Sequence, residues 1–205
     1  MTLDIECVST APRVFVIDKF LSDAEADSII QLARDKVERS YVGTVDEDGA
    51  RTSDTRTSRN TWFSRKVSPI LQTITKRVAN ALNVPFHILD PNSELLQVVH
   101  YKNNEKYDSH HDWGVDGYPE SRYITMLMYL TSQLDENSGG ETAFPKGGSG
   151  GGFKVRPVKG MAVIFYNLLP DGNGDDLALH AALPVSNGEK WMANYWVWDP
   201  VKNFT

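Results

Sequence analysis

Two segments in the first half of the chain carry apolar residues at helical spacing. The first follows Ser22-Asp-Ala-Glu25, which matches the capping box of a helix N-terminus. The second begins at Ser68-Pro69, because proline is tolerated in the first helical turn. The apolar positions of the two segments are Ile29, Ile30, Ala33 and Val37, and then Ile70, Ile74, Val78 and Leu82. We expect both helices to support the fold rather than to carry chemistry.

Beyond Asn92 the pattern changes to short runs rich in β-branched and aromatic residues, separated by glycine, proline and aspartate clusters. These runs cover residues 95–101, 123–130, 161–166 and 191–198. Such a pattern predicts an all-β barrel or jelly roll. We therefore expect a single domain over residues 1–205, with residues 1–92 as helical and strand support and residues 93–200 as the barrel core.

Two further segments have no periodic pattern. Residues 42–60 are polar, carry Arg51, Arg56 and Arg59, and are predicted to form a loop or a weak hairpin. Residues 147–152 are rich in glycine but lack the GxxxxGK[ST] order of a phosphate loop, and no helical pattern follows them. We expect this second segment to be a connector between strands.

Composition narrows the class of protein. The 205 residues suit one domain with a substantial core. With 21 Lys and Arg against 27 Asp and Glu, the net charge of −6 argues against a nucleic-acid partner bound through its phosphates. The single cysteine, Cys7, excludes an intrachain disulfide and a metal site built from several cysteines.

No part of the sequence suggests a membrane segment. No apolar run approaches the roughly 18 to 20 residues that span a bilayer. The first residues also lack the basic and then apolar order of a signal peptide. The chain as written is expected to be cytoplasmic, and the endoplasmic reticulum is the alternative if its N-terminus has been trimmed.

The strongest chemical signal is His110-His111-Asp112, together with His180 and Lys190 farther along the chain. Two histidines and a carboxylate form the facial triad that binds Fe(II) and leaves positions open for dioxygen. In an extended strand the side chains at i and i+2 share a face, so His110 and Asp112 can reach one metal while His111 points away. Taken alone, such a tripeptide is weak, because most histidines are surface or hydrogen-bonded core residues.

Several motifs around these residues, in the same order, resemble the prolyl 4-hydroxylases, which are 2-oxoglutarate and Fe(II)-dependent dioxygenases. The matching blocks are residues 101–112, 122–130, 139–145, 179–184 and 188–198. The resemblance runs from about Pro12 to Trp198. It implies an α+β, mainly β fold with a double-stranded β-helix core, flanked by the N-terminal helices, and metal ligands in the barrel mouth.

The resemblance also implies a metal and a co-substrate. It implies that Fe(II) is held by His110, Asp112 and His180, that 2-oxoglutarate and O2 are consumed, and that ascorbate acts as reductant. Lys190 would bind the far carboxylate of 2-oxoglutarate, with hydrogen bonds from Tyr101 and Thr142. The catalytic set is thus His110, Asp112, His180 and Lys190.

The sequence around Lys190, His87 and His100 indicates which of them can bind a ligand. Lys190 lies in an otherwise apolar and aromatic strand, and because a lysine is rarely buried unpaired, an anion is expected beside it. The alternative is an exposed turn at residues 188–190. His87 and His100 match no ligand position and are expected to be structural.

A second group of residues is implied to bind substrate: Arg122, Trp196, Arg56 and Tyr107. Trp196 alternates with Tyr195, so one of these two aromatic side chains faces the barrel interior, and the resemblance favours Trp196. The segment around Arg56 resembles a lid that closes over a peptide. Solvated loop charges are the alternative for its arginines.

The function implied is that of a procollagen-proline 4-dioxygenase-like enzyme acting on peptidyl proline in Pro-rich polypeptides, as a monomer or weak oligomer. A polyproline II chain suits an open groove because it has no internal hydrogen bonds. Alternatives are a lysyl or small-molecule hydroxylase, a nucleobase demethylase, which the acidic charge disfavours, and a catalytically silent peptide-binding barrel. A zinc hydrolase could use the same three ligands but would leave Lys190 unexplained.

Overall fold

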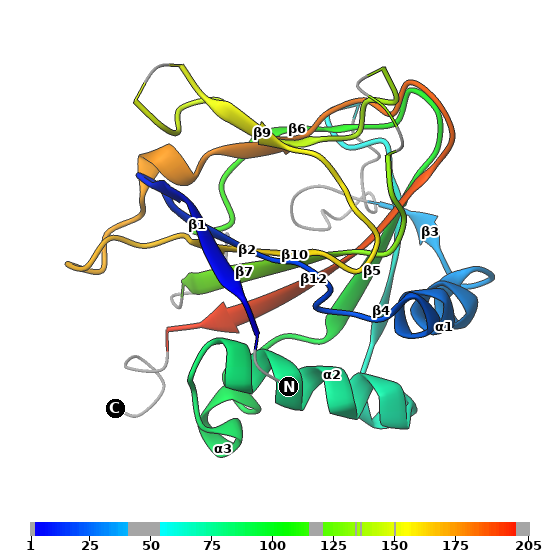
Figure 1. Cartoon of the computed structure of the whole chain (residues 1–205), viewed down its shortest axis with the longest axis horizontal. Helices are drawn as coiled ribbons and strands as arrows, with labels where there is room; N and C mark the ends of the chain where they lie inside the picture. The colour runs from blue at the N-terminus through cyan, green and yellow to red at the C-terminus, as the bar shows by residue number, and fades with distance from the viewer. Residues whose placement is uncertain are drawn as a thin grey trace, which may run out of the picture.

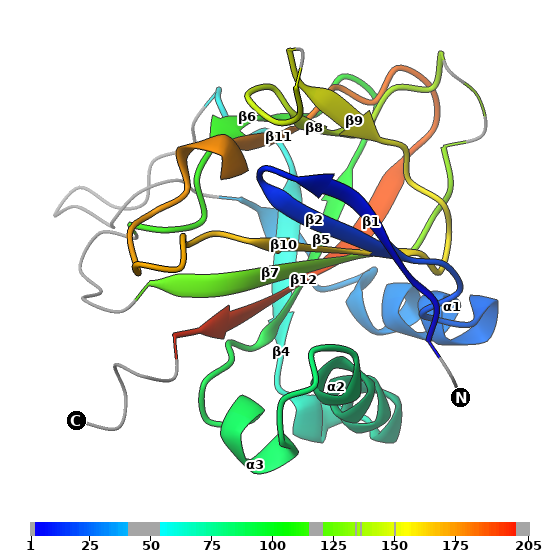
Figure 2. The ribbon, with the colours of Figure 1, turned by 60° about the vertical axis from the view of Figure 1, so that its left-hand side comes forward.

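Two antiparallel sheets stack face to face, and helices cover the outer face of the larger sheet (Figures 1 and 2). The computed structural model describes residues 3–40, 54–114, 121–133, 135, 137–149 and 151–199. From edge to edge, the larger sheet contains β1 (Ile5–Thr10), β2 (Arg13–Ile17), β10 (Ala162–Tyr166), β7 (Arg122–Tyr129), β12 (Lys190–Trp198), β5 (Leu96–Tyr101), β4 (Arg59–Phe63) and β3 (Glu38–Arg39). The smaller sheet contains β6 (Tyr107–His110), β11 (His180–Ala182), β8 (Thr142–Phe144) and β9 (Phe153–Val155). This arrangement is typical of a double-stranded β-helix, and the predicted mainly β fold is confirmed.

Both expected helices are present below the larger sheet (Figure 2). Helix α1 (Asp23–Ala33) begins with the predicted capping box: the Ser22 hydroxyl accepts the Glu25 N–H at 3.3 Å, and the Glu25 carboxylate accepts the Ser22 N–H at 2.9 Å. Helix α2 (Pro69–Ala81) begins at the expected proline. Arg77 of α2 donates to both oxygens of Glu25, at 2.7 and 2.9 Å, and so joins the two helices.

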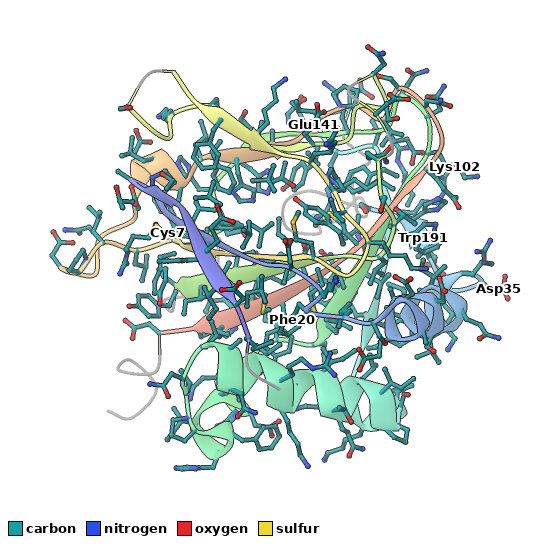
Figure 3. All side chains as sticks on the ribbon, in the orientation of Figure 1. Cys7, Phe20, Asp35, Lys102, Glu141 and Trp191 are labelled. Carbon is teal, nitrogen blue, oxygen red and sulfur yellow. The ribbon has the colours of Figure 1, made fainter. Side chains whose placement is uncertain are left out.

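Alternation along β12 divides its side chains between two hydrophobic cores. The residues on the helix side are Trp191, Ala193, Tyr195 and Val197. The residues on the opposite face are Lys190, Met192, Asn194 and Trp196. Met192 packs in the second core with Tyr129 of the larger sheet and Phe144 of the smaller sheet. Figure 3 shows side chains filling both spaces, with Phe20 in the interior and Cys7 on β1.

The four strands expected beyond Asn92 are confirmed as β5, β7, β10 and β12, with small differences at their ends. The loop or hairpin expected over residues 42–60 is described only in part, because residues 42–53, including Arg51, lie outside the described residues. Arg59 and Asn60 are not loop residues, since they begin β4, which pairs with β3 as one side of a hairpin. The supporting region and the barrel core therefore share one sheet.

Short elements escaped the sequence pattern. Strands β6, β8, β9 and β11, the 3-10 turns η1 (Arg65–Val67) and η2 (Asp176–Ala178) and the one-turn helix α3 (Phe86–Leu89) are too short to show a period. Strands β1 and β2 were also missed, although they are as long as β5 and β10. The glycine-rich segment 147–152 connects β8 to β9, as expected, although Gly150 lies outside the described residues. The segment leads directly into strand β9 rather than into a helix, unlike a phosphate loop.

Candidate active site

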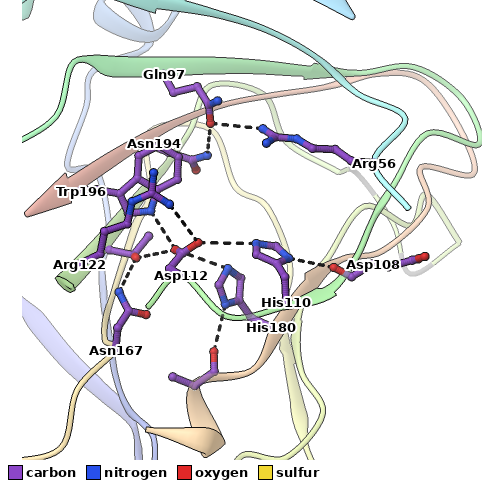
Figure 4. Close-up of polar contacts among 12 residues, drawn as sticks. Arg56, Gln97, Asp108, His110, Asp112, Arg122, Asn167, His180, Asn194 and Trp196 are labelled. Carbon is purple, nitrogen blue, oxygen red and sulfur yellow. Dashed lines mark hydrogen bonds and ion pairs between the residues drawn. The ribbon is translucent and has the colours of Figure 1, made fainter. Parts of the chain in front are cut away.

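The three predicted metal ligands meet at the end of the smaller sheet (Figure 4). His110, the last residue of β6, pairs directly across the strands with His180, the first residue of β11. One ligand atom from each of His110, Asp112 and His180 lies within 4.8 Å of the others. Asp112 Oδ1 is 3.7 Å from His110 Nε2, and its Oδ2 is 3.7 Å from His180 Nε2. These donors can surround one metal ion.

The reason for choosing His110 over His111 differs from the one expected. Strand β6 ends at His110, so Asp112 lies in a bend after the strand rather than on an alternating strand face. The expectation of one continuous strand is therefore wrong at Asp112. His111 nevertheless points away, with its Nε2 at 3.3 Å from the backbone oxygen of Asp176. The chain bend, rather than strand alternation, turns Asp112 toward the two histidines.

Backbone carbonyls fix the tautomers of both histidine ligands. His110 Nδ1 is 2.8 Å from the Asp108 oxygen, and His180 Nδ1 is 3.0 Å from the Ala178 oxygen (Figure 4). Because a carbonyl only accepts, each Nδ1 carries the proton and each Nε2 keeps its lone pair for a metal. Burial lowers the pKa of His110 to about 3, which keeps the ring neutral near pH 7, as a metal ligand must be.

Asp112 is a buried carboxylate with well-defined donors. Its Oδ2 accepts the Thr125 hydroxyl at 2.6 Å and the Trp196 indole N–H at 2.9 Å. Burial opposes ionisation, but the two histidines, Arg122 and the Thr125 hydrogen bond lower the pKa of Asp112 below its ordinary value. The group is therefore an anion near neutral pH.

Lys190 is fully buried, which excludes the alternative of an exposed turn. Its Nζ lies 5.3 Å from the ring centre of Tyr101 and 5.6 Å from that of Tyr129. It has no hydrogen-bond partner among the described residues. Burial lowers the pKa of Lys190 to about 7, and the more distant charge of Glu141 opposes this only in part. A buried amine without a protein partner suits the carboxylate of a ligand.

Tyr101 lies beside Lys190, and Thr142 is linked to the same region through Tyr129. Tyr101 stands opposite Lys190 across β5 and β12, and burial raises the pKa of its phenol to about 12. The Thr142 hydroxyl accepts the Tyr129 O–H at 2.7 Å. Tyr129 was missed from the sequence, although its position in the predicted strand, two residues after Leu127 on the same face, was the available signal.

A single pocket joins the metal triad to Tyr101 and Thr142. Tyr101, Thr142 and the three metal ligands line it together with residues of β4, β5 and β12. Sequence analysis missed three of the polar or aromatic side chains in its wall: Trp62, Gln97 and Asn194. Gln97 Oε1 accepts the Asn194 amide at 2.9 Å, and both residues face the pocket because they alternate with core positions.

Residues 96–198 match the family described as the 2OG-Fe(II) oxygenase superfamily. The chain belongs to this superfamily. The oxygenase is 37% identical over 207 residues to prolyl 4-hydroxylase 1 of Arabidopsis thaliana, covering 94% of this chain and 71% of that protein. It is 35% identical over 215 residues to probable prolyl 4-hydroxylase 7 of the same plant, covering 96% of this chain but 65% of that protein.

Solved structures agree with these relatives. The oxygenase superposes on the 2OG complex of a viral collagen prolyl hydroxylase from Paramecium bursaria Chlorella virus-1 with a TM-score of 0.72 and 32% identity. The match covers 93% of this chain and 98% of that chain. A Pseudomonas putida prolyl-4-hydroxylase, at 15% identity and a TM-score of 0.65, shares the fold. The oxygenase is therefore prolyl 4-hydroxylase-like over nearly its whole length.

The site fits the metal and the co-substrate of this superfamily. Two imidazoles and one carboxylate are the donor set of the facial triad that binds Fe(II). The partnerless Lys190 amine fits a carboxylate of 2-oxoglutarate. A zinc hydrolase would use the same triad but gives no role to Lys190.

Arg122 and Trp196 form one wall of the oxygenase pocket. Trp196 faces the pocket, whereas Tyr195 points to the opposite side and shares a 2.8 Å hydrogen bond with Ser93. The Arg122 guanidinium lies 3.9 Å from the ring centre of Trp196 and donates to both oxygens of Glu94, at 2.6 and 3.0 Å. The ion pair with Glu94 holds Arg122 over the indole.

Arg56 and Tyr107 form the wall beside the first histidine. The Tyr107 ring stacks on His110 with centres 3.7 Å apart, and the Arg56 guanidinium lies 4.7 Å from the Tyr107 centre. Arg56 also donates to Gln97 Oε1 at 3.4 Å, while its buried Nε has no partner among the described residues. Arg56 is thus part of the pocket wall and not a solvated loop charge.

The two other histidines of the described chain lie away from the triad. His100 stacks on Trp191 with ring centres 4.0 Å apart, and its Nε2 is 2.8 Å from Glu189. His87 is exposed on α3. The packing of His100 agrees with the structural role expected for it, and for His87 that role stays a prediction.

Proposed function

We propose that this oxygenase hydroxylates proline residues at C4 in extended, Pro-rich polypeptides, with ascorbate keeping its iron reduced. One observation carries the proposal. A single pocket connects the His-Asp-His triad and Tyr101, whose ring centre lies 5.3 Å from Lys190 Nζ, to a wall of aromatic and cationic side chains. The names of the relatives, which are prolyl and collagen prolyl hydroxylases, support the same substrate class.

The inner end of the pocket would hold the iron and 2-oxoglutarate. His110, Asp112 and His180, which all line the pocket, would hold the metal. When bound, iron would couple the decarboxylation of 2-oxoglutarate by O2 to hydroxylation, with one atom of O2 ending in succinate, the other inserted into a C–H bond, and CO2 released. Lys190 binds the far carboxylate of 2-oxoglutarate, and because this amine is desolvated, the contact is stronger than one in water.

The outer wall would hold the peptide. The flat rings of Tyr107, Trp196 and Trp62 offer faces against which pyrrolidine rings can pack, and Trp62 is 42% exposed at the mouth. Trp62 and Trp196 have ring centres 5.7 Å apart, which extends the apolar surface from the iron outward. A polyproline II chain leaves its carbonyl oxygens unpaired, and the guanidinium groups of Arg56 and Arg122 can donate to them.

Other properties follow the same proposal. The open pocket fits a polypeptide substrate, and the acidic net charge argues against a nucleic-acid partner. A monomeric or weakly associating state stays a prediction. None of the described helices has the length and apolar character needed to cross a membrane. A cytoplasmic location, or the endoplasmic reticulum, stays a prediction.

The test is a panel assay with Fe(II), 2-oxoglutarate and ascorbate. Collagen-like, Ser-Pro-rich and polyproline peptides are compared with lysine-rich peptides and small amino acids. We expect succinate and a peptide that gains one oxygen atom on proline only with the Pro-rich set. Oxygen gain on lysine or on a free amino acid would show that the enzyme is a lysyl or small-molecule hydroxylase instead. Metal binding without succinate formation with any substrate would indicate a catalytically silent binding module.

A further inference from the structure

Asn167, which follows β10, stands behind the iron site and is fully buried. Its amide Nδ2 donates to the Thr125 hydroxyl oxygen at 2.8 Å, and Thr125 donates to Asp112 Oδ2 at 2.6 Å (Figure 4). Thr125 is also fully buried. A chain of two hydrogen bonds therefore runs from Asn167 to a metal ligand without contact to solvent.

The direction of these hydrogen bonds is fixed by the chemistry of the groups. A threonine hydroxyl has one hydrogen, and an ionised carboxylate is its strongest available acceptor. The Thr125 hydroxyl oxygen accepts a hydrogen bond from the Asn167 amide. The single hydroxyl hydrogen of Thr125 therefore points at Asp112. The indole of Trp196 can only donate. Asp112 Oδ2 thus receives two obligate donors.

The other oxygen of Asp112 is left for a metal. Oδ1 has no hydrogen bond from the described residues: Arg122 Nη1, at 3.9 Å, is too far, and His110 Nε2, at 3.7 Å, carries a lone pair rather than a proton. A carboxylate with one oxygen saturated by donors and the other free presents a single oxygen to a cation. The hydrogen bonds therefore select between the two oxygens.

Asn167 is also hydrogen-bonded to the segment that leads into His180. Its backbone oxygen accepts the N–H of Asp175 at 2.8 Å. The Asp175 side chain in turn accepts the Leu177 N–H at 2.9 Å and caps the turn η2, which leads into His180. One residue is thus bonded through its side chain to the Asp112 half of the triad and through its backbone to the His180 half.

We propose that Asn167, acting through Thr125, is a positioning residue that directs Asp112 to bind the metal through Oδ1 alone. The inference rests on the metal-binding part of the proposed function, and not on the identity of the peptide. Residues behind metal ligands typically change metal affinity by about 10- to 100-fold when they are removed. Asn167 should therefore act on the metal before any substrate is present.

The test uses Co(II), whose visible absorption reports the number of ligands, on the metal-free full chain. Thr125→Val removes the hydroxyl at nearly constant side-chain shape, and Asn167→Leu removes the amide. Thr125→Ser keeps the hydroxyl and is the conservative control. We expect Thr125→Val to weaken Co(II) binding by roughly 10- to 100-fold. Asn167→Leu should shift the absorption in the same direction with a smaller loss of affinity, and Thr125→Ser should remain close to the parent in both readouts.

A double variant and a matched control separate positioning from simple destabilisation. Because Asn167 acts through Thr125, Asn167→Leu combined with Thr125→Val should bind Co(II) as Thr125→Val alone does. Asn92→Leu removes another buried asparagine, whose amide donates to the Ile88 oxygen, and should lower the melting temperature without changing the Co(II) spectrum.

Two results would overturn the proposal: additive losses in the double variant, or a parental Co(II) affinity and spectrum in folded Asn167→Leu. Failure of the proposed function gives a different result. A parent that binds Co(II) with the expected pattern among the variants, but hydroxylates no Pro-rich peptide, would refute the peptide assignment and support the role of Asn167.

Discussion

The indole N–H of Trp196 donates a 2.9 Å hydrogen bond to Oδ2 of Asp112. A residue expected to contact the peptide thus also supports a metal ligand. Arg122 lies 3.9 Å from the centre of the same indole and 3.9 Å from Asp112 Oδ1. If these two residues bind the peptide as proposed, Trp196 would link the peptide wall to the metal ligand Asp112.

Replacement of Trp196 by phenylalanine should separate its two roles. Trp196→Phe keeps an aromatic face for Arg122 and for the peptide but removes the donor to Asp112. A hydrogen bond to a charged group is worth about 1.5 to 3 kcal/mol, so Fe(II) affinity should fall roughly 10- to 100-fold while peptide KM at saturating iron changes little. Isothermal titration with metal and peptide kinetics measure the two effects. Parental metal affinity in Trp196→Phe would show that the hydrogen bond is dispensable.

The two adjacent histidines should differ sharply in metal binding. His110→Ala should abolish turnover and most Fe(II) binding, because the Nε2 of His110 faces the metal. His111→Ala should retain iron, since His111 contacts Asp176 and the Trp113 ring instead. Metal content after dialysis gives the comparison. Retention of iron in His110→Ala together with its loss in His111→Ala would reverse the ligand assignment.

Much of this site could be predicted because its motifs resemble those of the prolyl 4-hydroxylases, which pointed to the triad, Lys190 and Trp196. Strand alternation added that Trp196 and Tyr195 face opposite sides of β12, and the structure places Trp196 in the pocket wall and Tyr195 against Ser93. Asp112 was grouped correctly for a different reason, because a bend that no periodicity reveals turns it to the metal. Thr125 and Asn167 could not be predicted, since their contact joins positions 42 residues apart through a pairing of β7 and β10.

Lys190 should govern the affinity for 2-oxoglutarate and not that for iron. A charge-assisted contact is worth about 1.5 to 3 kcal/mol, so Lys190→Ala should weaken 2-oxoglutarate binding roughly 10- to 100-fold. Metal binding should be spared, because the Lys190 amine contacts no ligand of the triad. Lys190→Met, which keeps the buried volume, controls for a cavity. Unchanged 2-oxoglutarate affinity in a folded, iron-loaded variant would remove this role from Lys190.

The affinity for 2-oxoglutarate should fall as the pH rises above about 7. Burial lowers the pKa of Lys190 to about 7, and only the protonated amine attracts a carboxylate. Binding then raises this pKa, so that a proton is taken up at pH 8 and affinity decreases by up to about tenfold per pH unit. Tyr101, whose pKa is raised to about 12 by burial, stays protonated throughout this range.

Calorimetry in two buffers with different ionisation enthalpies measures that proton uptake. Lys190→Arg is the matched control, because a guanidinium stays charged in this range and should bind without proton uptake. His110, with its pKa lowered to about 3, titrates well below the window. Equal pH dependence in the parent and in Lys190→Arg would assign the effect to another group.

The arginines of the pocket should control coupling between the two products. Arg122→Ala removes a cation from the outer wall and leaves Glu94 without its partner, so peptide KM should rise and hydroxyproline should fall below succinate. Arg56→Ala should show a milder rise in KM, because its contacts with Tyr107 and Gln97 are longer. Glu94→Gln, which keeps a hydrogen-bond acceptor for Arg122, serves as the control for the broken ion pair. Paired measurement of succinate and hydroxyproline decides the question, and parental KM and coupling in Arg122→Ala would place the peptide on a different surface.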